Sequence, residues 1–427
     1  MEHAQRIAAR TVRRVLAGST LPVALAAANG VALEDRALIQ ELAYGTLRFL
    51  GQLRAVVRAL ADRPLTDASV EALLWVALYQ LIHTSAPQHA VVDGAVKATT
   101  RVKKSSARGL TNAILRNFLR RRDEVLAPLA RDDEARFSYP RWWIDLVRGE
   151  YGARAALVLD SGNERPPLTL RINRRALSRD SYLATLAVQG IEANAVGDAG
   201  VVLAEPRAVM GLPGYAEGWF LVQDAGAQLA APLLGVDDGM RVLDVCAAPG
   251  GKTTHLAELA ALDLVALDID GSRLERVTQN LARLDLRARV VAADATDTGR
   301  WWDGVAFDRI LVDAPCTASG VVRRHPDGKW LRRESDVVAF SGQQQRLLDA
   351  MWPCLAQGGR LLYATCSIFR AENSEQVAAF SARHDNVLHL PLQLPAGFAH
   401  NDGQLLPSGA GAEHNHDGFF YALLQKK

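Results

Sequence analysis

The stretch 240–261 reads MRVLDVCAAPGGKTTHLAELAA, an apolar run followed by a glycine-rich turn and a helical pattern. The continuous apolar run predicts a buried strand, and the apolar spacing after the turn predicts a helix. The same succession recurs downstream, with predicted strands at 264–270, 288–294, 308–314 and 359–367 and predicted helices at 272–284 and 337–355. Such alternation predicts a mostly parallel sheet with helices on both faces, so ligands are expected at the carboxyl ends of the strands.

Composition places the chain among ordinary globular proteins. Its 427 residues are 49% apolar and 22% charged, and the formal net charge of +2 does not by itself indicate a polyanionic partner. The four cysteines are Cys246, Cys316, Cys354 and Cys366, and they form no CxxC pair. We therefore expect reduced thiols, no metal site and a cytoplasmic location. No stretch reaches the roughly 18 apolar residues of a membrane span.

The chain divides into three expected domains, 1–135, 136–235 and 236–427. The first has a helical pattern throughout, including an arginine-rich opening that we interpret as a structural helix and not as a transit peptide. Its segment EALLWVALYQLIH (71–83) is apolar on nearly every side and predicts the central helix of a bundle. The second domain has strand patterns at 168–174, 200–206 and 218–225 around one helix, which predicts a small α/β domain.

Two basic segments are candidate RNA-binding surfaces. Residues 94–122 contain no Asp or Glu, although a solvated helical face remains the alternative interpretation. The second segment follows Cys316 and has an aromatic neighbour, Trp330; its alternative interpretation is a charged loop. The residues expected to contact RNA are Lys103, Lys104, Arg120, Arg121, Arg323, Arg324, His325, Lys329 and Arg332. For Arg171, on a predicted strand, RNA contact and a structural role are equally open.

The turn after the first strand of the third domain is a candidate cofactor site. It comprises Cys246, Ala247, Ala248, Pro249, Gly250, Gly251 and Lys252, without the spacing of a dinucleotide or phosphate-binding loop. Adjacent glycines allow close approach of a ligand, and the helix that follows offers free N–H groups. Asp268, Asp270 and Asp294 lie at the ends of the next two strands. Together these features indicate an adenosine-containing cofactor, although each acid alone is compatible with a helix cap.

Two cysteines at strand ends are candidate nucleophiles. Cys316 lies in Asp313-Ala314-Pro315-Cys316, and Cys366 lies in Thr365-Cys366-Ser367. Cys354, which falls inside the predicted helix 337–355, and Cys246 are interpreted as packing residues.

These segments, in this order, resemble the RNA cytosine-C5 methyltransferase family (NOL1/NOP2/Sun): VLDVCAAPGGKTTHLAE, VALDID, DRILVDAPCTASG and LLYATCS. The resemblance implies a Rossmann-like class I methyltransferase domain that uses S-adenosylmethionine to methylate carbon 5 of a cytosine. It implies that Cys366 attacks C6 of the base, that Cys316 assists release of the product, and that Asp313 contacts the base close to the methyl donor. Gly250, Gly251, Lys252, Asp268 and Asp294 are implied to line the cofactor site.

Further segments resemble the bacterial Sun/Fmu-type 16S ribosomal RNA methyltransferases. These are GVVRRHPDGKWLRR (320–333), DGFFYALLQKK (417–427) and the helical first domain, which is similar to the antitermination factor NusB. The resemblance implies 16S ribosomal RNA, or an assembling small ribosomal subunit, as substrate and a monomeric enzyme. One departure is DAPCTASG, where these relatives usually read DAPCSATG.

There are four alternatives. DNA cytosine-C5 enzymes use the cysteine of a Pro-Cys motif, which here is Cys316. A non-catalytic RNA-binding assembly factor, or C5 methylation of a different RNA, is also compatible with the NusB-like front domain. Amino methylation is disfavoured because the strand end reads DAPC and not Asn/Asp-Pro-Pro-aromatic.

Overall fold

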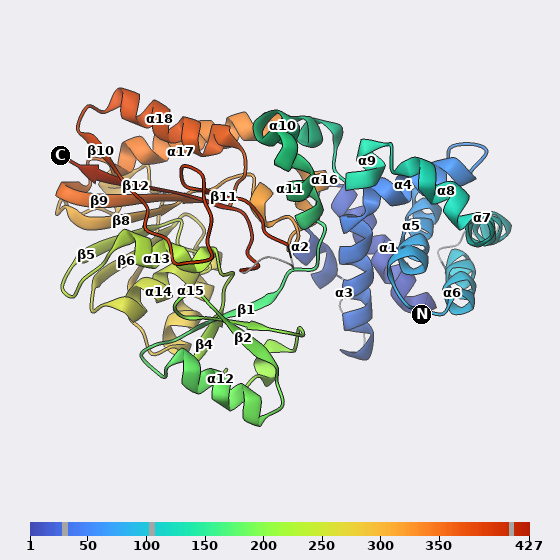
Figure 1. Cartoon of the computed structure of the whole chain (residues 1–427), viewed down its shortest axis with the longest axis horizontal. Coiled ribbons are helices and arrows are strands. Elements are labelled where there is room, and N and C mark those ends of the chain that lie inside the picture. The colour runs from blue at the N-terminus through green and yellow to red at the C-terminus, as the bar shows by residue number, and fades with distance from the viewer. Residues whose placement is uncertain (28–32, 102–106, 410–413) are drawn as a thin grey trace. The chain divides into compact units, whose positions relative to one another are not determined.

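A computed structural model describes residues 1–27, 33–101, 107–409 and 414–427. The chain forms two compact units, one of residues 1–163 with 322–334 and one of residues 164–321 with 335–427 (Figure 1). Residues 136–163 of the second expected domain and 322–334 of the third thus belong to the helical unit, which the sequence did not indicate. None of the helices in these ranges is long and apolar enough to cross a membrane.

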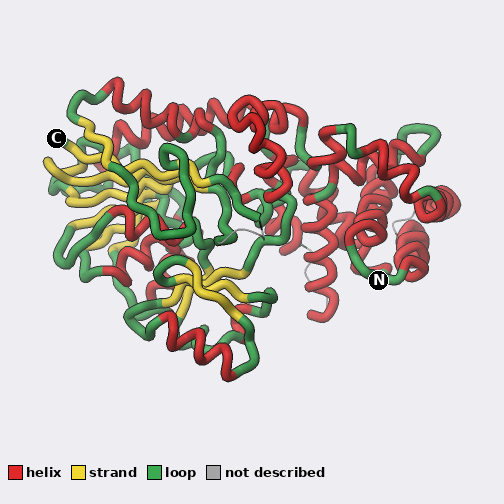
Figure 2. Tube along the Cα trace, viewed as in Figure 1, coloured by secondary structure: helices red, strands yellow, loops and turns green. Residues whose placement is uncertain are grey.

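The first unit consists of helices joined by loops (Figure 2). Its centre is α5, whose N-cap residue Asp67 accepts hydrogen bonds from the amides of Ser69 (2.9 Å) and Val70 (3.3 Å). The helices are α1 (Glu2–Leu16), α2 (Leu21–Ala26), α3 (Leu33–Arg48), α4 (Leu50–Leu60), α5 (Ala68–His83), α6 (Gln88–Arg101), α7 (Arg108–Arg120), α8 (Arg122–Leu129), α9 (Asp133–Phe137), α10 (Arg141–Tyr151), α11 (Ala155–Ser161) and α16 (Gly328–Leu331).

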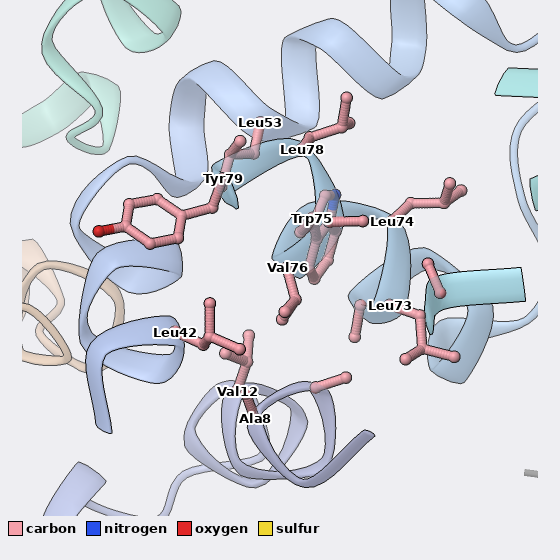
Figure 3. Close-up of a cluster of buried hydrophobic side chains, with 14 of the residues drawn as sticks. Ala8, Val12, Leu42, Leu53, Leu73, Leu74, Trp75, Val76, Leu78 and Tyr79 are labelled. Atoms are coloured by element: carbon pink, nitrogen blue, oxygen red, sulfur yellow. The ribbon is translucent and has the colours of Figure 1, made fainter. Parts of the chain in front are cut away.

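Helix α5 is buried on all sides, as its apolar sequence predicts. Figure 3 shows Leu73, Trp75 and Val76 among side chains that include Ala8 and Val12 of α1. Each fully buried side chain of this size contributes roughly 1.5–3 kcal/mol. The helical bundle of the first unit therefore has its own hydrophobic core around α5.

The second unit contains a small antiparallel sheet in the order β2-β3-β1-β4. Its elements are β1 (Leu168–Ile172), α12 (Arg179–Val188), β2 (Ala193–Val196), β3 (Gly200–Leu203) and β4 (Phe220–Val222). Tyr182 and Leu186 of α12 pack on Leu170, Ile172 and Phe220 of the sheet. The expected small α/β domain is present, with β2 as an additional strand.

The larger sheet of the second unit has the order β10-β12-β9-β8-β5-β6-β7, with β11 paired to β12. Its five strands from β7 to β9 are parallel, and β10, β11 and β12 add an antiparallel edge that the sequence did not predict. The elements are α13 (Ala230–Leu234), β5 (Arg241–Val245), α14 (Gly251–Leu259), β6 (Asp263–Asp268), α15 (Gly271–Arg283), β7 (Arg289–Ala292), β8 (Phe307–Asp313), α17 (Glu334–Met351), β9 (Leu355–Thr365), α18 (Ser374–Arg383), β10 (Val387–Leu390), β11 (Gln404–Leu405) and β12 (Phe419–Lys426).

Alternate residues of the parallel strands pack on opposite faces. Val242 and Leu311 belong to a core shared with α13, α14 and α15, whereas Leu243 and Ile310 belong to a core shared with α17 and α18. The expected mostly parallel sheet with helices on both faces is confirmed (Figure 1). Because β5 pairs with β6 on one side and β8 on the other, the strand order reverses beside β5. Ligands of such sheets bind at this reversal.

One local prediction was wrong. Cys354 does not lie in a helix, because α17 ends at Met351 and β9 begins at Leu355. Pro353 lacks the N–H that a continuing helix requires, which accounts for the end of α17 here. Cys354 is nevertheless fully buried, in agreement with its interpretation as a packing residue.

Candidate active site

The turn between β5 and α14 has a constrained backbone. Gly250 has a φ of 96°, and a Cβ atom there would lie 3.0 Å from the Cα atom of Val277. Only glycine suits both conditions without a shift of neighbouring backbone. The side chains of Arg273 and Asn280 donate to the carbonyls of Ala248 (2.9 Å) and Pro249 (3.0 Å). Helix α15 thus holds the turn open at the N-terminus of α14, where no side chain caps the helix.

The acids at the next strand ends have different roles. Asp268 is buried and accepts from the amides of Ala248 (3.1 Å) and Asp270 (3.0 Å), so it fixes the same turn. Asp270 caps α15 by accepting from the amides of Ser272 and Arg273, which is the ordinary role the sequence also allowed. Asp294 is exposed, and its hydrogen bonds from Thr296 hold the pKa of the carboxyl below its usual value. Asp268 and Asp294 therefore lie at the ends of neighbouring strands, as expected.

An ion pair joins the turn to the end of β8. The Nζ atom of Lys252 lies 2.6 Å from Oδ2 of Asp313. Burial lowers the pKa of Lys252, but the charges of Asp313, Cys366 and Asp244 outweigh it and raise the pKa overall. Lys252 therefore keeps a positive charge between the candidate cofactor turn (246–252) and the loops after β8 and β9 that carry Cys316 and Cys366, which we call the cysteine loops.

The two candidate cysteines are brought together. The Sγ atoms of Cys316 and Cys366 are 3.4 Å apart, at the ends of the neighbouring parallel strands β8 and β9. Cys316 is buried and Cys366 is half-buried. The hydrogen bond with Cys366, followed by burial, raises the pKa of the Cys316 thiol well above its ordinary value. Cys316 therefore keeps its proton more strongly than a free thiol does.

Cys246 lies apart from this pair, half-buried in the cofactor turn with a φ of 61°. Burial raises the pKa of its thiol, with further contributions from Asp313 and Asp268, which favours the neutral form. Its interpretation as a packing residue whose backbone shapes the turn stays a prediction.

Sequence reasoning missed a buried carboxylate beneath the two cysteines. Glu372 accepts hydrogen bonds from Thr317 and Ser367, the residues that follow Cys316 and Cys366. Asn373 donates to the carbonyl of Ser367 (2.9 Å) and accepts from the hydroxyl of Thr365 (2.6 Å). The sequence signal was weak, because a Glu-Asn pair before a helix is typical of an ordinary N-terminal cap.

The basic residues are divided by the structure. Arg323 and Lys329 are buried in the first unit, contrary to the expectation of an exposed rim loop. Lys329 donates to the carbonyl of Arg48 (2.7 Å) and to Oδ1 of Asn163 (2.6 Å), and burial lowers its pKa well below the usual value. We expected these two residues to contact RNA, but both are buried in the helical bundle of the first unit.

The other basic candidates differ in their exposure. Arg120 and Arg121 are exposed at the end of α7, with Arg121 paired to Glu124 (2.6 Å). His325 is exposed, whereas Arg324 and Arg332 are half-buried. Lys103 and Lys104 lie outside the described residues. Arg171, whose role was open, is fully buried and forms an ion pair with Glu258 (2.7 Å), so it joins β1 to α14.

Family models match three consecutive parts of the chain. Residues 2–120 match the NusB family, residues 139–210 match the ferredoxin-like domain of RsmF/B-like methyltransferases, and residues 231–425 match "16S rRNA methyltransferase RsmB/F".

Curated proteins and solved structures are similar to the chain over most of its length. The chain is 46% identical to ribosomal RNA small subunit methyltransferase B of Pseudomonas putida, over 98% of this chain and 97% of that protein. It is 42% identical to the protein of the same name from Erwinia tasmaniensis, over 100% of this chain and 99% of that protein. The crystal structure of PH0851 shares the fold, with a TM-score of 0.80 at 24% identity over 100% of this chain and 99% of that chain. A methyltransferase homologue from Pyrococcus horikoshii aligns with a TM-score of 0.60 at 28% identity, over 69% of this chain and 98% of that chain. The chain therefore belongs to the 16S rRNA methyltransferase RsmB/F family, whose members methylate RNA of the small ribosomal subunit.

Proposed function

We propose that this chain methylates carbon 5 of a cytosine in 16S ribosomal RNA through a covalent adduct with Cys366. The observation that carries the proposal is the 3.4 Å approach of two thiols at the ends of β8 and β9. The addition step requires only the attacking thiol. The elimination step also requires a proton-transferring group nearby, which the second thiol supplies.

The burial of the two thiols supports separate roles. Cys366 is half-buried and can meet a base that is turned out of its stack, so it adds to C6. The electron pair moves to C5, which then takes the methyl group. Cys316 lies within reach to assist departure of Cys366, because its buried thiol keeps its proton and can donate it to the leaving sulfur. The C5 proton passes to a base such as solvent water, the electron pair of that C–H bond restores the C5–C6 double bond, and the Cys366 sulfur leaves C6.

The residues beside the thiols fit S-adenosylmethionine. The open N-terminus of α14 suits a carboxylate, and Asp268 and Asp294 supply acceptors for ribose hydroxyls and an amino group. Gly250 lets the turn lie against Val277 of α15, which fixes the turn at that N-terminus. S-adenosylmethionine supplies an electrophilic methyl group when bound. Lys252 holds Asp313 between the turn and the thiols, where the carboxylate is placed to orient the base.

The test compares wild type, Cys366→Ala and Cys316→Ala on 16S ribosomal RNA and on small subunits with labelled S-adenosylmethionine. We expect wild type to form 5-methylcytosine and Cys366→Ala to be inactive. Cys316→Ala is expected to accumulate RNA-linked protein on a denaturing gel. Methylation by Cys366→Ala would return the attacking role to Cys316, and an inactive wild type on both substrates would support a non-catalytic assembly factor.

A further inference from the structure

The carboxylate of Glu372 lies where the loops of Cys316 and Cys366 meet. Its Oε1 atom accepts from the amide of Thr317 (2.8 Å), and its Oε2 atom accepts from the hydroxyls of Thr317 (2.6 Å) and Ser367 (2.5 Å). Gln344 of α17 donates a fourth hydrogen bond to Oε1 (3.2 Å). One side chain therefore binds the residue that follows each cysteine.

The backbone beneath Glu372 is anchored independently. The Tyr363 hydroxyl donates to the Glu372 carbonyl (2.7 Å), and the Asn373 side chain bonds Thr365 and Ser367. These contacts tie the segment 370–373 to β9 and the loop after it. The carboxylate then extends from this fixed base across to the loop after β8. The anchored backbone of segment 370–373 thus fixes the position of the Glu372 carboxylate relative to both loops.

All four contacts of the Glu372 carboxylate come from donors. Burial raises the pKa of Glu372 overall, although the hydrogen bonds from Ser367 and Thr317 act to lower it. An ionised carboxylate accepts from all four donors. The carboxamide of Glu372→Gln has one accepting oxygen and one NH₂ group, and the NH₂ group cannot accept from the hydroxyls that donate to Glu372. The loops are also linked directly, by the Ser319 and Ser367 hydroxyls (3.0 Å), the Ile368 amide to the Ser319 hydroxyl (2.9 Å), the Gly320 amide to the Cys366 carbonyl (2.8 Å) and the Thr317 and Ser367 hydroxyls (3.4 Å). Glu372 is the side chain that joins the residues directly after both cysteines through one group.

We propose that Glu372 is a positioning residue that sets the separation of the Cys316 and Cys366 thiols. The inference rests on the proposed function for its catalytic meaning, because the spacing matters only if one thiol adds to the base and the other assists release. Loss of the carboxylate removes the bridge between Thr317 and Ser367, so the residues that follow the two cysteines are held together less firmly. Addition by Cys366 then continues, while release, which needs both thiols together, slows.

The first experiment measures the spacing without RNA or cofactor. Diamide oxidises neighbouring thiols: a Cys316–Cys366 S–S bond forms, both thiol protons are lost, and the azo group of diamide takes up two electrons and two protons to become a hydrazine. The rate of closure is followed by mass spectrometry of the linked peptides. We expect closure in Glu372→Gln to be at least fivefold slower than in wild type. A rate equal to or above that of wild type overturns the proposal.

The second experiment measures catalysis. We expect Glu372→Gln to lower kcat at saturating RNA and S-adenosylmethionine by at least tenfold and to raise the fraction of RNA-linked protein. A merely structural role lowers both quantities together with the folded fraction. Thr317→Val, which removes one hydroxyl donor at nearly constant volume, is the milder variant if Glu372→Gln folds poorly. It should change both measurements in the same direction.

The matched control is Gln376→Met. Gln376 is also buried and polar, and it donates to the Ser341 carbonyl (2.6 Å) between α18 and α17 without bonding either cysteine loop. It should lower thermal stability and leave thiol closure and kcat unchanged. If disulfide closure in Glu372→Gln is slower but kcat is unchanged, Glu372 has no role in catalysis. If kcat is lower but closure is unchanged, Glu372 does not set the separation of the two thiols. If wild type neither methylates RNA nor forms adducts, but closure is still slower in Glu372→Gln, the proposed function is contradicted. The role of Glu372 in setting the thiol separation is then still supported.

Discussion

Lys252 and Asp313 form an ion pair of 2.6 Å that joins the first turn of α14 to the end of β8. One partner belongs to the candidate cofactor turn, and the other is three residues before Cys316. The reversal of strand order beside β5 is what brings these two segments together. The ion pair thus connects the two halves of the proposed reaction, the methyl donor and the base.

Replacing Lys252 by Met should lower the methylation rate by at least about tenfold, because the half-buried Asp313 carboxylate loses the cation that holds it in place. The rate and the affinity for S-adenosylmethionine, by calorimetry, check this expectation. Arg241→Met is the control, since Arg241 pairs with Asp303 (2.5 Å) at the opposite end of the sheet. If both variants reduce activity equally, the effect of Lys252 is one of general stability.

Gly250→Ala should weaken S-adenosylmethionine binding, because the added Cβ would meet the backbone of Val277 at 3.0 Å. Its control is Gly239→Ala, before β5, which has a similar φ of 81° but no atom within 4 Å of the added Cβ. Both variants carry the strain of a left-handed L-residue, roughly 1–2 kcal/mol. Calorimetric titration and thermal unfolding separate the two effects. Equal losses of affinity would show that strain, and not the Val277 contact, is responsible.

The sequence predicted the parts of the site that depend on local pattern. The glycine turn, Asp268, Asp294 and both cysteines were identified because parallel strands bring their carboxyl ends to one edge. The glycine at position 250 was informative, since a left-handed φ beside a close backbone neighbour accepts no other residue well.

The sequence did not predict features that depend on tertiary packing. Arg323 and Lys329 have the composition of an RNA-binding loop, but they are buried where the segment 322–334 returns to the helical unit. Charge alone does not reveal that a lysine amine meets a backbone carbonyl 281 positions away. Glu372 was missed for the same reason, because its partner Thr317 is 55 positions distant. The antiparallel edge strand β12 likewise acquires its place only by pairing with β9.

Asp244 makes the stability of the second unit depend on pH. Burial raises the pKa of this carboxyl to about 7, although the Thr253 hydroxyl donates to it (2.5 Å). The folded pKa is higher than the unfolded one, so the folded chain holds a proton that the unfolded chain has lost between about pH 4 and 7. Asp244 therefore contributes stability at low pH that is lost as the pH rises to about 7, by up to about 1.4 kcal/mol per pH unit.

Asp244→Asn should remove this dependence. Urea unfolding at pH 5 and pH 8 should show a smaller difference between the two pH values for the variant than for wild type. Asp303→Asn is the comparison, because Asp303 is exposed and Arg241 lowers its pKa, so that this carboxyl is ionised at both pH values and the difference should equal that of wild type. An unchanged difference between pH 5 and pH 8 in Asp244→Asn would mean that Asp244 is ionised throughout this range.

Lys329 and Arg120 separate stability from RNA binding in the first unit. Lys329→Met removes the donor to the Arg48 carbonyl and the Asn163 side chain, and also the ammonium that lies 4.2 Å from the centre of the Tyr139 ring. We expect it to lower the free energy of unfolding by about 1–3 kcal/mol and to leave the salt dependence of RNA binding unchanged. Arg120→Gln, on the exposed end of α7, should leave the unfolding free energy unchanged.

The affinity of Arg120→Gln for 16S ribosomal RNA should instead depend less steeply on salt, with a slope of log K against log salt shallower by about one. Filter binding over a range of salt concentrations and urea unfolding, carried out on both variants, check these expectations. A shallower salt slope for Lys329→Met would show that its ammonium meets phosphate and would restore the role that the sequence suggested. An unchanged slope for Arg120→Gln would move the RNA-binding surface away from the end of α7.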